Sequence, residues 1–416
     1  MVDPANQLDA IADVLIEEGR IAAVGPKLQV TGAERLDASG LVVAPGFIDM
    51  HVHLREPGFE YAETIESGSR AAAAGGFTTI CCMPNTSPVN DNATVTSYII
   101  ERAERHAAVN VFPIGAITKG SAGEELAAIG SMRQAGIVAI SDDGRPVMNA
   151  RLMRRAMETA RSFGIPVIDH CEDLHLSAGG DMHEGVESVR MGLRGIPAAS
   201  EDVMVARDIL LAELTGAHFH VAHISSRHAV DMVAFAKSRG IAVTCEATPH
   251  HFSLCDADMP PYDSNYKMKP PLRSPCDTGS VTQGIIAGTV DAIATDHAPH
   301  AGSEKMQEFE KCPFGIIGLE TAVALALERL VQPGKISLAR LVELFTSGPA
   351  RILNLKRGSL AVGTPGDLTI LDLEREWTYD VNKSASKSRN SPFHKHAFRG
   401  SPAATIVNGR VVWKAN

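Results

Sequence analysis

The sequence Leu-Val-Val-Ala-Pro-Gly-Phe-Ile-Asp-Met-His-Val-His, residues 41–53, decides how this chain folds. A mostly apolar run, typical of a buried strand, leads directly into the polar end Asp49-Met50-His51-Val52-His53. Side chains two residues apart on a strand point to the same face, so His51 and His53 are expected to lie side by side. Two neutral imidazoles on one face can chelate a divalent ion, which makes this strand end a candidate metal site.

The same arrangement of an apolar run followed by a polar cluster occurs four more times along the chain. The clusters are Ser141-Asp142-Asp143-Gly144, Asp169-His170-Cys171-Glu172, Ala222-His223-Ile224-Ser225 and Thr295-Asp296-His297-Ala298-Pro299-His300. A parallel barrel brings the C-terminal ends of all its strands to one rim, so ligands far apart in sequence meet in space. The five clusters therefore predict one metal centre on such a rim.

Apolar, β-rich runs alternate with helix-like stretches, a pattern typical of βα units and a parallel sheet. Near-continuous apolarity indicates strands that are covered on both faces. Eight strands are predicted, over roughly residues 42–50, 77–83, 109–116, 136–141, 165–169, 218–223, 241–246 and 290–295. The fold expected is α/β, a (β/α)8 TIM barrel over residues 44–357.

The two ends of the chain have a different pattern. Residues 1–43 and 358–416 are predicted to form short strands, with hairpin turns at Glu18-Gly19 and Asn408-Gly409. The Asn-Gly pair is a strong hairpin signal because both residues tolerate positive φ. We expect both termini to build one small β-module beside the barrel, and the abrupt start within its first strand leaves open whether the N-terminus is complete. Polar residues 382–391 are expected to form a surface loop.

The composition excludes several classes of protein. Of 416 residues, 44% are hydrophobic and 21% charged, as in ordinary globular proteins. The net charge of −10 argues against a nucleic-acid partner or an anionic membrane surface. No apolar stretch reaches 18 residues and the N-terminus carries no leader pattern, so a cytoplasmic location is expected. The seven cysteines, without Cys-x-x-Cys spacing, are expected to be free thiols.

The ligand types favour a particular kind of metal site. Imidazole with carboxylate, and no thiolate cluster, favours zinc or a similar divalent ion in a catalytic site. Asp142 and Asp143 both follow the fourth predicted strand, and spacing alone does not decide which of them reaches a metal. His218 and His220 repeat the His-x-His spacing, but they lie early in their strand and are expected to be structural. His250 and His251 are expected to pack behind the site.

Three motifs together resemble the amidohydrolase superfamily, and more closely the bacterial class I dihydroorotases. They are residues 51–58 (His-Val-His-Leu-Arg-Glu-Pro-Gly), residues 83–86 (Met-Pro-Asn-Thr) and the cluster at residues 295–300. The resemblance covers almost the whole chain, including residues 313–320. It implies one or two zinc ions per subunit, with His51, His53 and Asp296 around one ion. The second would be held by His170 and His223, and Asp143 would bridge the two in place of the carboxylated lysine of other members.

The resemblance also implies roles in catalysis and substrate binding. Asp296 would be the catalytic group that moves the proton. Arg55 has a planar guanidinium suited to a carboxylate, and by resemblance Asn85 and His300 contact the same group. Backbone groups near Phe314 and Gly315 would bind the amide edge of a pyrimidine ring. The activity implied is that of a zinc-dependent cyclic amidohydrolase, interconverting N-carbamoyl-L-aspartate and L-dihydroorotate in de novo pyrimidine synthesis.

Several alternatives stay open. Similar enzymes usually carry asparagine where Lys269 stands, and a lysine can donate a hydrogen bond to substrate but cannot accept one. Hydantoinases, dihydropyrimidinases and allantoinases depend on a strand-four lysine that is absent here. Non-catalytic subunits that support aspartate transcarbamoylase lose metal ligands that this chain keeps. The partner expected is a small-molecule substrate, and the sequence leaves open both a homodimer and an association with aspartate transcarbamoylase.

Overall fold

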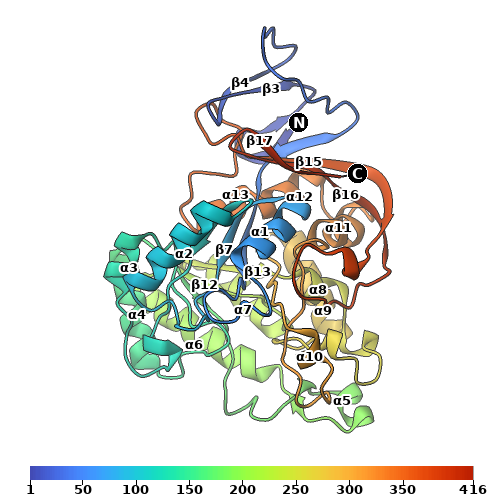
Figure 1. Cartoon of the computed structure of the whole chain (residues 1–416). Helices are drawn as coiled ribbons and strands as arrows, with labels where there is room; N and C mark the ends of the chain where they lie inside the picture. Colours follow the sequence, from blue (N-terminus) through green and yellow to red (C-terminus); the bar gives the residue numbers. More distant parts are fainter. Residues whose placement is uncertain (416) are drawn as a thin grey trace.

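The computed structural model describes residues 1–415 and consists of a large α/β body joined to a smaller β-rich part that holds both ends of the chain (Figure 1). Seven parallel strands form the body. They are β6 (Phe47–Val52), β7 (Phe77–Cys82), β8 (Asn110–Pro113), β9 (Val167–Asp169), β12 (Phe219–Val221), β13 (Val243–Ala247) and β14 (Ala292–Ile293).

Three parallel bridges close these strands into a ring. Ile140 pairs with Gly115, just beyond β8, and with Val167 in β9, so it stands as the eighth strand position. His297, beyond β14, pairs with Val52 in β6. The order β6-β7-β8-Ile140-β9-β12-β13-β14 confirms the predicted barrel. Of the fourth predicted strand, residues 136–141, only Ile140 pairs with its neighbours.

The first predicted strand, residues 42–50, is wrong as a single element. Its first half is β5 (Val42–Pro45), which pairs antiparallel with β15 (Leu368–Thr378) in the small β-module, and its second half is β6. Gly46 separates the two, and a Cβ there would lie 2.1 Å from Thr78 Oγ1. Both halves are mostly apolar and almost entirely buried. The sequence therefore shows no change in polarity where the chain passes from the β-module into the barrel. The module boundary predicted at residue 43 consequently falls inside β5.

Helices cover the outside of the barrel (Figure 1). The longer ones are α1 (Ile65–Ala74), α2 (Ala93–His106), α3 (Ile129–Ala135), α4 (Ala150–Ser162), α6 (Ala199–Thr215), α7 (Arg227–Ser238), α9 (Pro275–Ala287) and α12 (Leu338–Phe345). Shorter helices and strands are α5 (Val186–Met191), α8 (Pro249–Ser253), α10 (Gly302–Lys305), α11 (Ala322–Ala326), α13 (Ser347–Ile352), β10 (Met182–His183) and β11 (Gly195–Ile196). Many begin at a polar cap: the Thr64 side chain, for example, accepts a hydrogen bond from the Ser67 N–H.

The barrel interior is filled by apolar side chains and closed at one end by aromatic rings. One buried cluster draws on strands around the ring and on α13, with Met50, Cys81, Ile114, Ile168, Ala222, Ala294 and Ile352 among its members. Phe47 and Phe77, the first residues of β6 and β7, contact Phe345 of α12 with ring centroids 5.2 and 5.7 Å away. This aromatic plug lies at the strand starts, opposite the polar strand ends.

The small β-module is built from both termini, as predicted. Its main sheet has the order β17-β16-β15-β5, with β16 (Ala397–Val407) and β17 (Arg410–Lys414), and the N-terminus adds β1 (Val2–Asp3), β2 (Leu8–Asp9), β3 (Asp13–Glu17) and β4 (Arg20–Gly25). Both predicted hairpin turns are confirmed. Glu18 and Gly19 have φ of 49° and 76°, and Asn408 and Gly409 have φ of 48° and 76°.

The polar segment predicted as a surface loop, residues 382–391, lies only partly at the surface. Its exposed residues are Asn382, Lys383, Lys387 and Arg389. Half of the segment is buried, and Ser386, Ser388 and Asn390 are each less than 4% exposed. Buried polar side chains need hydrogen-bond partners, and here the partners are a buried carboxylate, Glu63, and backbone groups of the barrel. Polarity alone therefore did not predict the buried half.

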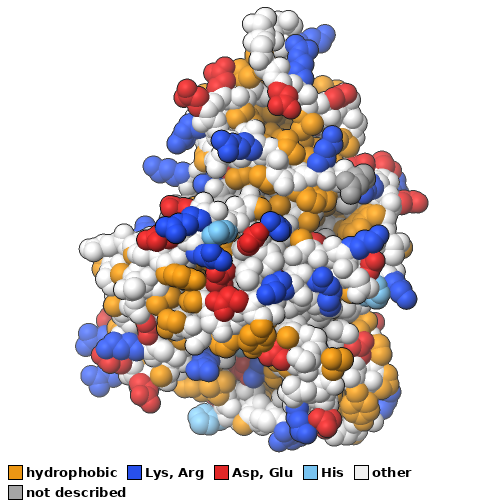
Figure 2. Space-filling model, in the orientation of Figure 1, with side chains coloured by type: hydrophobic (Ala, Val, Ile, Leu, Met, Phe, Trp, Pro, Cys, Tyr) orange, Lys and Arg blue, Asp and Glu red, His pale blue; other side chains and the backbone are white. Residues whose placement is uncertain are grey.

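The surface matches the composition. On the face drawn in Figure 2, basic and acidic side chains are interspersed rather than gathered into one patch. Within residues 1–415, no helix is both long and apolar enough to cross a membrane. All seven cysteines are free thiols, as predicted, and Cys81 and Cys82 are buried.

We predict that Phe345→Ala destabilises the protein by about 3–5 kcal/mol, because it removes a ring from the fully buried aromatic plug. Guanidinium unfolding followed by circular dichroism measures the effect. Phe235→Ala is the matched control, because the Phe235 side chain is 63% exposed and its loss should change stability little. Equal shifts for both variants would contradict the packing described here.

Candidate metal centre

The ends of the barrel strands bring all six predicted metal ligands to one place. Each ligand lies at the end of a different barrel strand, except that His51 and His53 both lie at the end of β6. The six are His51, His53, Asp143 beyond Ile140, His170 beyond β9, His223 beyond β12 and Asp296 beyond β14, and every one is buried. They form three overlapping sets of three residues whose ligand atoms lie within 4.8 Å of one another.

One half of the cluster gathers around Asp296. Its Oδ1 lies 3.0 Å from His53 Nε2 and 3.4 Å from His51 Nε2. The other half gathers around His170 and His223, whose Nδ1 and Nε2 atoms are 2.8 Å apart. Two sets of nitrogen and oxygen donors thus lie side by side at the rim.

Asp143 joins the two halves. Its Oδ1 lies 3.4 Å from His51 Nε2 and 3.7 Å from His223 Nε2, while its Oδ2 lies 3.4 Å from His53 Nε2. Asp142, the alternative that spacing left open, points elsewhere: its carboxylate accepts hydrogen bonds from the Ile117 and Thr118 N–H groups at 2.8 and 3.1 Å. The structure therefore places Asp143, not Asp142, between the two halves.

The cluster fits a divalent cation. Within the described residues, His51 Nε2 and Asp143 Oδ1 are buried without a hydrogen-bond partner. Ligands about 2.05 Å from a tetrahedral zinc ion are about 3.3 Å from one another, and the separations of 3.0 and 3.4 Å around Asp296 and His51 agree. A cation would satisfy polar atoms that the protein itself leaves unpaired.

The electrostatics of the cluster also favour a cation. Burial by itself lowers the pKa of His51, but the carboxylates of Asp296, Asp143 and Glu246 reverse this and hold the pKa well above its usual value. Burial raises the pKa of Asp296, and His51 and His53 more than offset that effect, so the pKa lies below its usual value. The site therefore carries an excess of buried negative charge.

Two carboxylates that sequence reasoning did not identify orient the histidines. Glu246, at the end of β13, has Oε1 2.7 Å from His51 Nδ1. Glu172 has Oε2 2.8 Å from His170 Nε2. Such carboxylates fix the ring orientation and leave the other ring nitrogen facing the metal position. A glutamate within the apolar run of β13 was the available signal for Glu246.

His218, His220 and His251 are hydrogen-bonded to neighbouring protein groups, as expected of residues that are not ligands. His218 Nε2 and His220 Nδ1 both lie 2.8 Å from Thr244 Oγ1, and His220 Nε2 is 3.3 Å from Glu246. His251 is hydrogen-bonded to Thr248 and to the Pro270 carbonyl. These rings lie behind the cluster and not among its ligand atoms.

The residues predicted to bind substrate adjoin the cluster. Asn85 Oδ1 accepts a hydrogen bond from His53 Nδ1 at 2.9 Å. Arg55 Nε donates to the Pro299 carbonyl at 3.1 Å, and Arg55 Nη2 lies 3.4 Å from His300 Nε2. Burial, together with the Arg55 charge, lowers the pKa of His300 to about 2, so the ring is neutral.

Phe314 and Gly315 pack against His300. The His300 Nε2–H group donates to the Phe314 carbonyl at 2.8 Å. Gly315 has φ of 153°, and a Cβ there would lie 2.7 Å from both the Ala298 carbonyl oxygen and His300 Cδ2. The Gly315 N–H group already donates to the Lys267 carbonyl at 2.9 Å. The backbone predicted to bind substrate is thus largely hydrogen-bonded within the protein.

Lys269 connects the metal cluster with the substrate side. Its Nζ lies 2.7 Å from Glu172 Oε1, the carboxylate that also holds His170. The same ammonium group lies 5.2 Å from the centre of the Phe314 ring. In this structure its nearest acceptor is a protein carboxylate.

A barrel with a histidine and carboxylate cluster at its strand ends defines a metal-dependent amidohydrolase. A family model described as "Amidohydrolase family" matches residues 286–413, and one described as "Dihydro-orotase-like" matches residues 40–229. A dihydroorotase of Solibacter usitatus is 72% identical over 413 residues, 99% of this chain and 96% of the relative. A dihydroorotase of Pelotomaculum thermopropionicum is 54% identical over 99% of this chain and 96% of its own. The chain belongs to the dihydroorotase family.

Solved structures support the fold assignment. An L-hydantoinase (dihydropyrimidinase) from Arthrobacter aurescens superposes with a TM-score of 0.88 at 26% identity, covering 97% of this chain and 92% of its own. A D-hydantoinase (dihydropyrimidinase) from Thermus sp. gives a TM-score of 0.83 at 27% identity, covering 97% and 93%. The barrel and the β-module are thus shared with amidohydrolases of related activity.

We predict that Glu246→Gln weakens metal binding about 10- to 100-fold, because it removes the carboxylate that orients His51. Competition with a chelator, followed by metal analysis of the protein, measures this. Glu101→Gln is the control, because that carboxylate is 66% exposed on α2. Unchanged metal affinity in Glu246→Gln would show that Glu246 does not support the site.

Proposed function

We propose that this chain interconverts N-carbamoyl-L-aspartate and L-dihydroorotate in de novo pyrimidine synthesis, with zinc as its metal. The observation that carries the proposal is that Arg55, whose guanidinium is suited to a substrate carboxylate, lies with His300 beside the metal cluster in a chain of the dihydroorotase family. Both compounds carry a carboxylate beside the amide that is formed or cleaved. A metal centre and a half-buried guanidinium would therefore bind the two ends of one small molecule.

Six side chains would hold the metal. His51 and His53, which both lie close to Asp296, would hold one ion with it, His170 and His223 would hold a second, and Asp143 lies within reach of both groups. Bound there, one or two zinc ions would polarise the amide carbonyl and lower the pKa of water from about 15.7 towards about 7. Asp143 takes the bridging place that a carboxylated lysine has in other amidohydrolases.

Asp296 is the group assigned to proton transfer. Its Oδ1 faces His51 and His53, which leaves Oδ2 for the reacting molecules. Despite burial, His51 and His53 hold the pKa of Asp296 below its usual value, so the carboxylate is ionised at neutral pH before it receives a proton. In ring opening it accepts the proton of the attacking water and passes it to the leaving ring nitrogen. In ring closure the same carboxyl group starts protonated.

Arg55 is the main donor for the substrate carboxylate. Its Nε is taken by the Pro299 carbonyl, which leaves the two Nη groups to form a fork. Asn85 turns Nδ2 towards Asp143 at 3.5 Å, a contact weak enough to be exchanged for substrate. The His300 ring is neutral, and its single ring N–H donates to the Phe314 carbonyl. His300 would therefore contact substrate either by van der Waals contact of the ring or by giving up that hydrogen bond. Lys269, Phe314 and Gly315 complete the proposed substrate side.

The competing functions are less well supported. Hydantoinases share the fold at 24–27% identity, whereas dihydroorotases share 49–72% of residues with this chain. A non-catalytic subunit would have no need of a complete set of buried ligands. The proposed setting is the cytoplasm, and either a homodimer or a complex with aspartate transcarbamoylase is compatible with the chemistry. Analytical ultracentrifugation, with and without that partner, distinguishes them.

We predict that Asp296→Asn lowers dihydroorotate hydrolysis by about 10²- to 10⁴-fold, because the amide cannot accept the water proton. Activity and zinc content are measured on the same sample, so that loss of proton transfer is separated from loss of metal. Retained activity in Asp296→Asn would contradict the assignment. Zinc without activity in the unaltered protein would point to another cyclic ureide.

We predict that Arg55→Gln raises the KM for dihydroorotate about 10- to 100-fold and leaves zinc content unchanged, because a charge-assisted pair of about 1.5–3 kcal/mol is lost. Steady-state kinetics with metal analysis measures both. Arg70→Gln removes an arginine that is 64% exposed on α1 and is the control. An unaltered KM in Arg55→Gln would place the substrate carboxylate elsewhere.

A further inference from the structure

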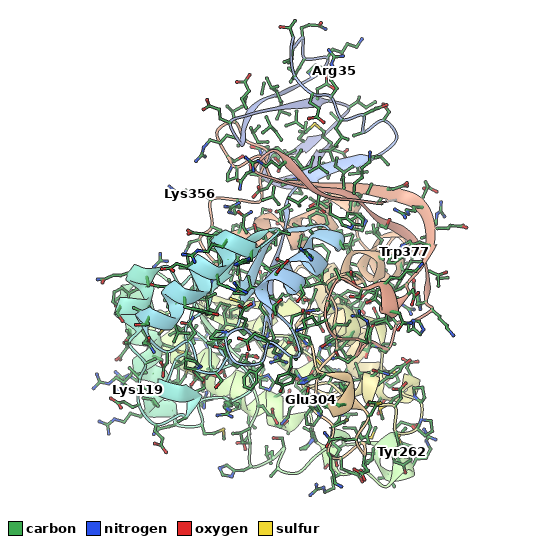
Figure 3. All side chains as sticks on the ribbon, viewed as in Figure 1. Arg35, Lys119, Tyr262, Glu304, Lys356 and Trp377 are labelled. Atoms are coloured by element: carbon green, nitrogen blue, oxygen red, sulfur yellow. The ribbon has the colours of Figure 1, made fainter. Side chains whose placement is uncertain are left out.

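The segment over residues 384–391, here called the strap, leaves the β-module between β15 and β16 and lies against the rim of the barrel. Figure 3 labels Trp377 near the end of β15, where the chain departs towards the barrel. Tyr379, Val381 and Phe393 on either side of the strap pack with Ile317 and Leu325 of the barrel in one buried cluster. The strap is thus fastened at both ends by apolar contacts.

Two carboxylates, the buried Glu63 and the half-buried Glu320, hold the first half of the strap. The Ser386 hydroxyl donates to Glu63 Oε2, and the Lys387 N–H donates to Glu63 Oε1 at 3.1 Å. The Ala385 N–H donates to Glu320 Oε1 at 3.0 Å. The Ser388 hydroxyl donates to the Ala62 carbonyl at 2.8 Å. These bonds fix where the strap places the residue that follows them, Asn390.

Asn390 contacts the two segments that carry proposed substrate-binding residues. Its Nδ2 donates to the Ala298 carbonyl at 2.9 Å and to the Gly315 carbonyl at 3.0 Å. Its Oδ1 accepts a hydrogen bond from the backbone N–H group of His300 at 3.1 Å. The side chain is 2% exposed. One side-chain amide from the β-module therefore joins the loop after β14 to the Phe314–Gly315 backbone by hydrogen bonds.

We propose that Asn390 is a positioning residue, which sets the spacing of His300 and Gly315 and thereby the fit of the carboxylated substrate. The inference rests on the proposed function and adds the β-module to the apparatus that binds substrate. Asn390 itself lies behind Ala298 and Gly315, so its effect is transmitted through His300, Gly315 and the Pro299 carbonyl that holds Arg55.

No other side chain of this size supplies the same bonds. An amide has two N–H donors and one carbonyl acceptor, and all three are used on the substrate segments. Aspartate would set a negative charge against two carbonyl oxygens, and serine would supply one donor at most. Space is also limiting, because His300 Cδ2 already lies 2.7 Å from where a Gly315 Cβ would be. A shift of either segment would therefore disturb the other.

The test compares Asn390→Ala with Ser388→Ala in the full-length, zinc-loaded protein. Both variants remove buried hydrogen bonds of the strap, but Ser388 contacts the Ala62 carbonyl and neither substrate segment. We expect Asn390→Ala to raise the KM for dihydroorotate about 10- to 100-fold, since the groups that hold the substrate carboxylate would be displaced and their charge-assisted hydrogen bonds weakened. Its kcat should fall much less. Ser388→Ala should keep the KM of the unaltered protein.

Zinc content and the thermal midpoint, measured on each variant, separate positioning from general damage. An unaltered KM in Asn390→Ala, an equal rise in Ser388→Ala, or a loss confined to zinc content would overturn the inference. If Asn390→Ala does not fold, Asn390→Ser, which keeps one donor, is judged by the same KM criterion. Failure of the proposed function is distinguishable, because the unaltered protein would then show no turnover of dihydroorotate.

Discussion

The metal centre depends on how the charge of the buried carboxylates at the rim of the barrel is compensated. Asp143, Asp296, Glu172 and Glu246 lie around four histidines, and all are buried. Burying several charges of one sign is costly unless they are compensated, and the raised pKa of His51 shows how strongly the cluster attracts positive charge. A divalent cation supplies that charge and also pairs the buried atoms that the protein leaves without partners.

The scaffold around the cluster explains how such a site is kept in place. Apolar side chains fill the barrel below it, and the aromatic plug of Phe47, Phe77 and Phe345 closes the opposite end. Above it, the strap from the β-module secures the loops that carry the substrate side. The metal ligands and the residues proposed to bind substrate both lie beyond strand ends, with Arg55 after β6, Asn85 after β7 and His300 after β14, and the strap supports the last of these from the β-module.

The sequence was sufficient to predict residues that recur at the ends of strands. It was not sufficient to predict burial that depends on packing between segments far apart in the chain. Histidine and aspartate at strand ends were sufficient to predict five of the six clustered residues, because barrel geometry converts position along a strand into position in space. The choice of Asp143 over Asp142 came from the family resemblance, since two adjacent residues at a strand end cannot be told apart by spacing. The partial burial of residues 384–391 was missed because their partners, Glu63 and Glu320, lie far away in sequence. The division of residues 42–50 was missed because both halves are apolar.

Anomalous diffraction at the zinc edge, from crystals of the zinc-loaded protein, tests the central claim most directly. The account predicts a strong peak among His51 Nε2, His53 Nε2 and Asp296 Oδ1, with any second peak between Asp143, His170 and His223. A different buried group, Asp169, Cys171 and Asp208, also brings three ligand atoms together, and it offers an internal comparison. A peak there and none beside His51 would contradict the account, as would zinc-loaded crystals without a peak at the barrel rim.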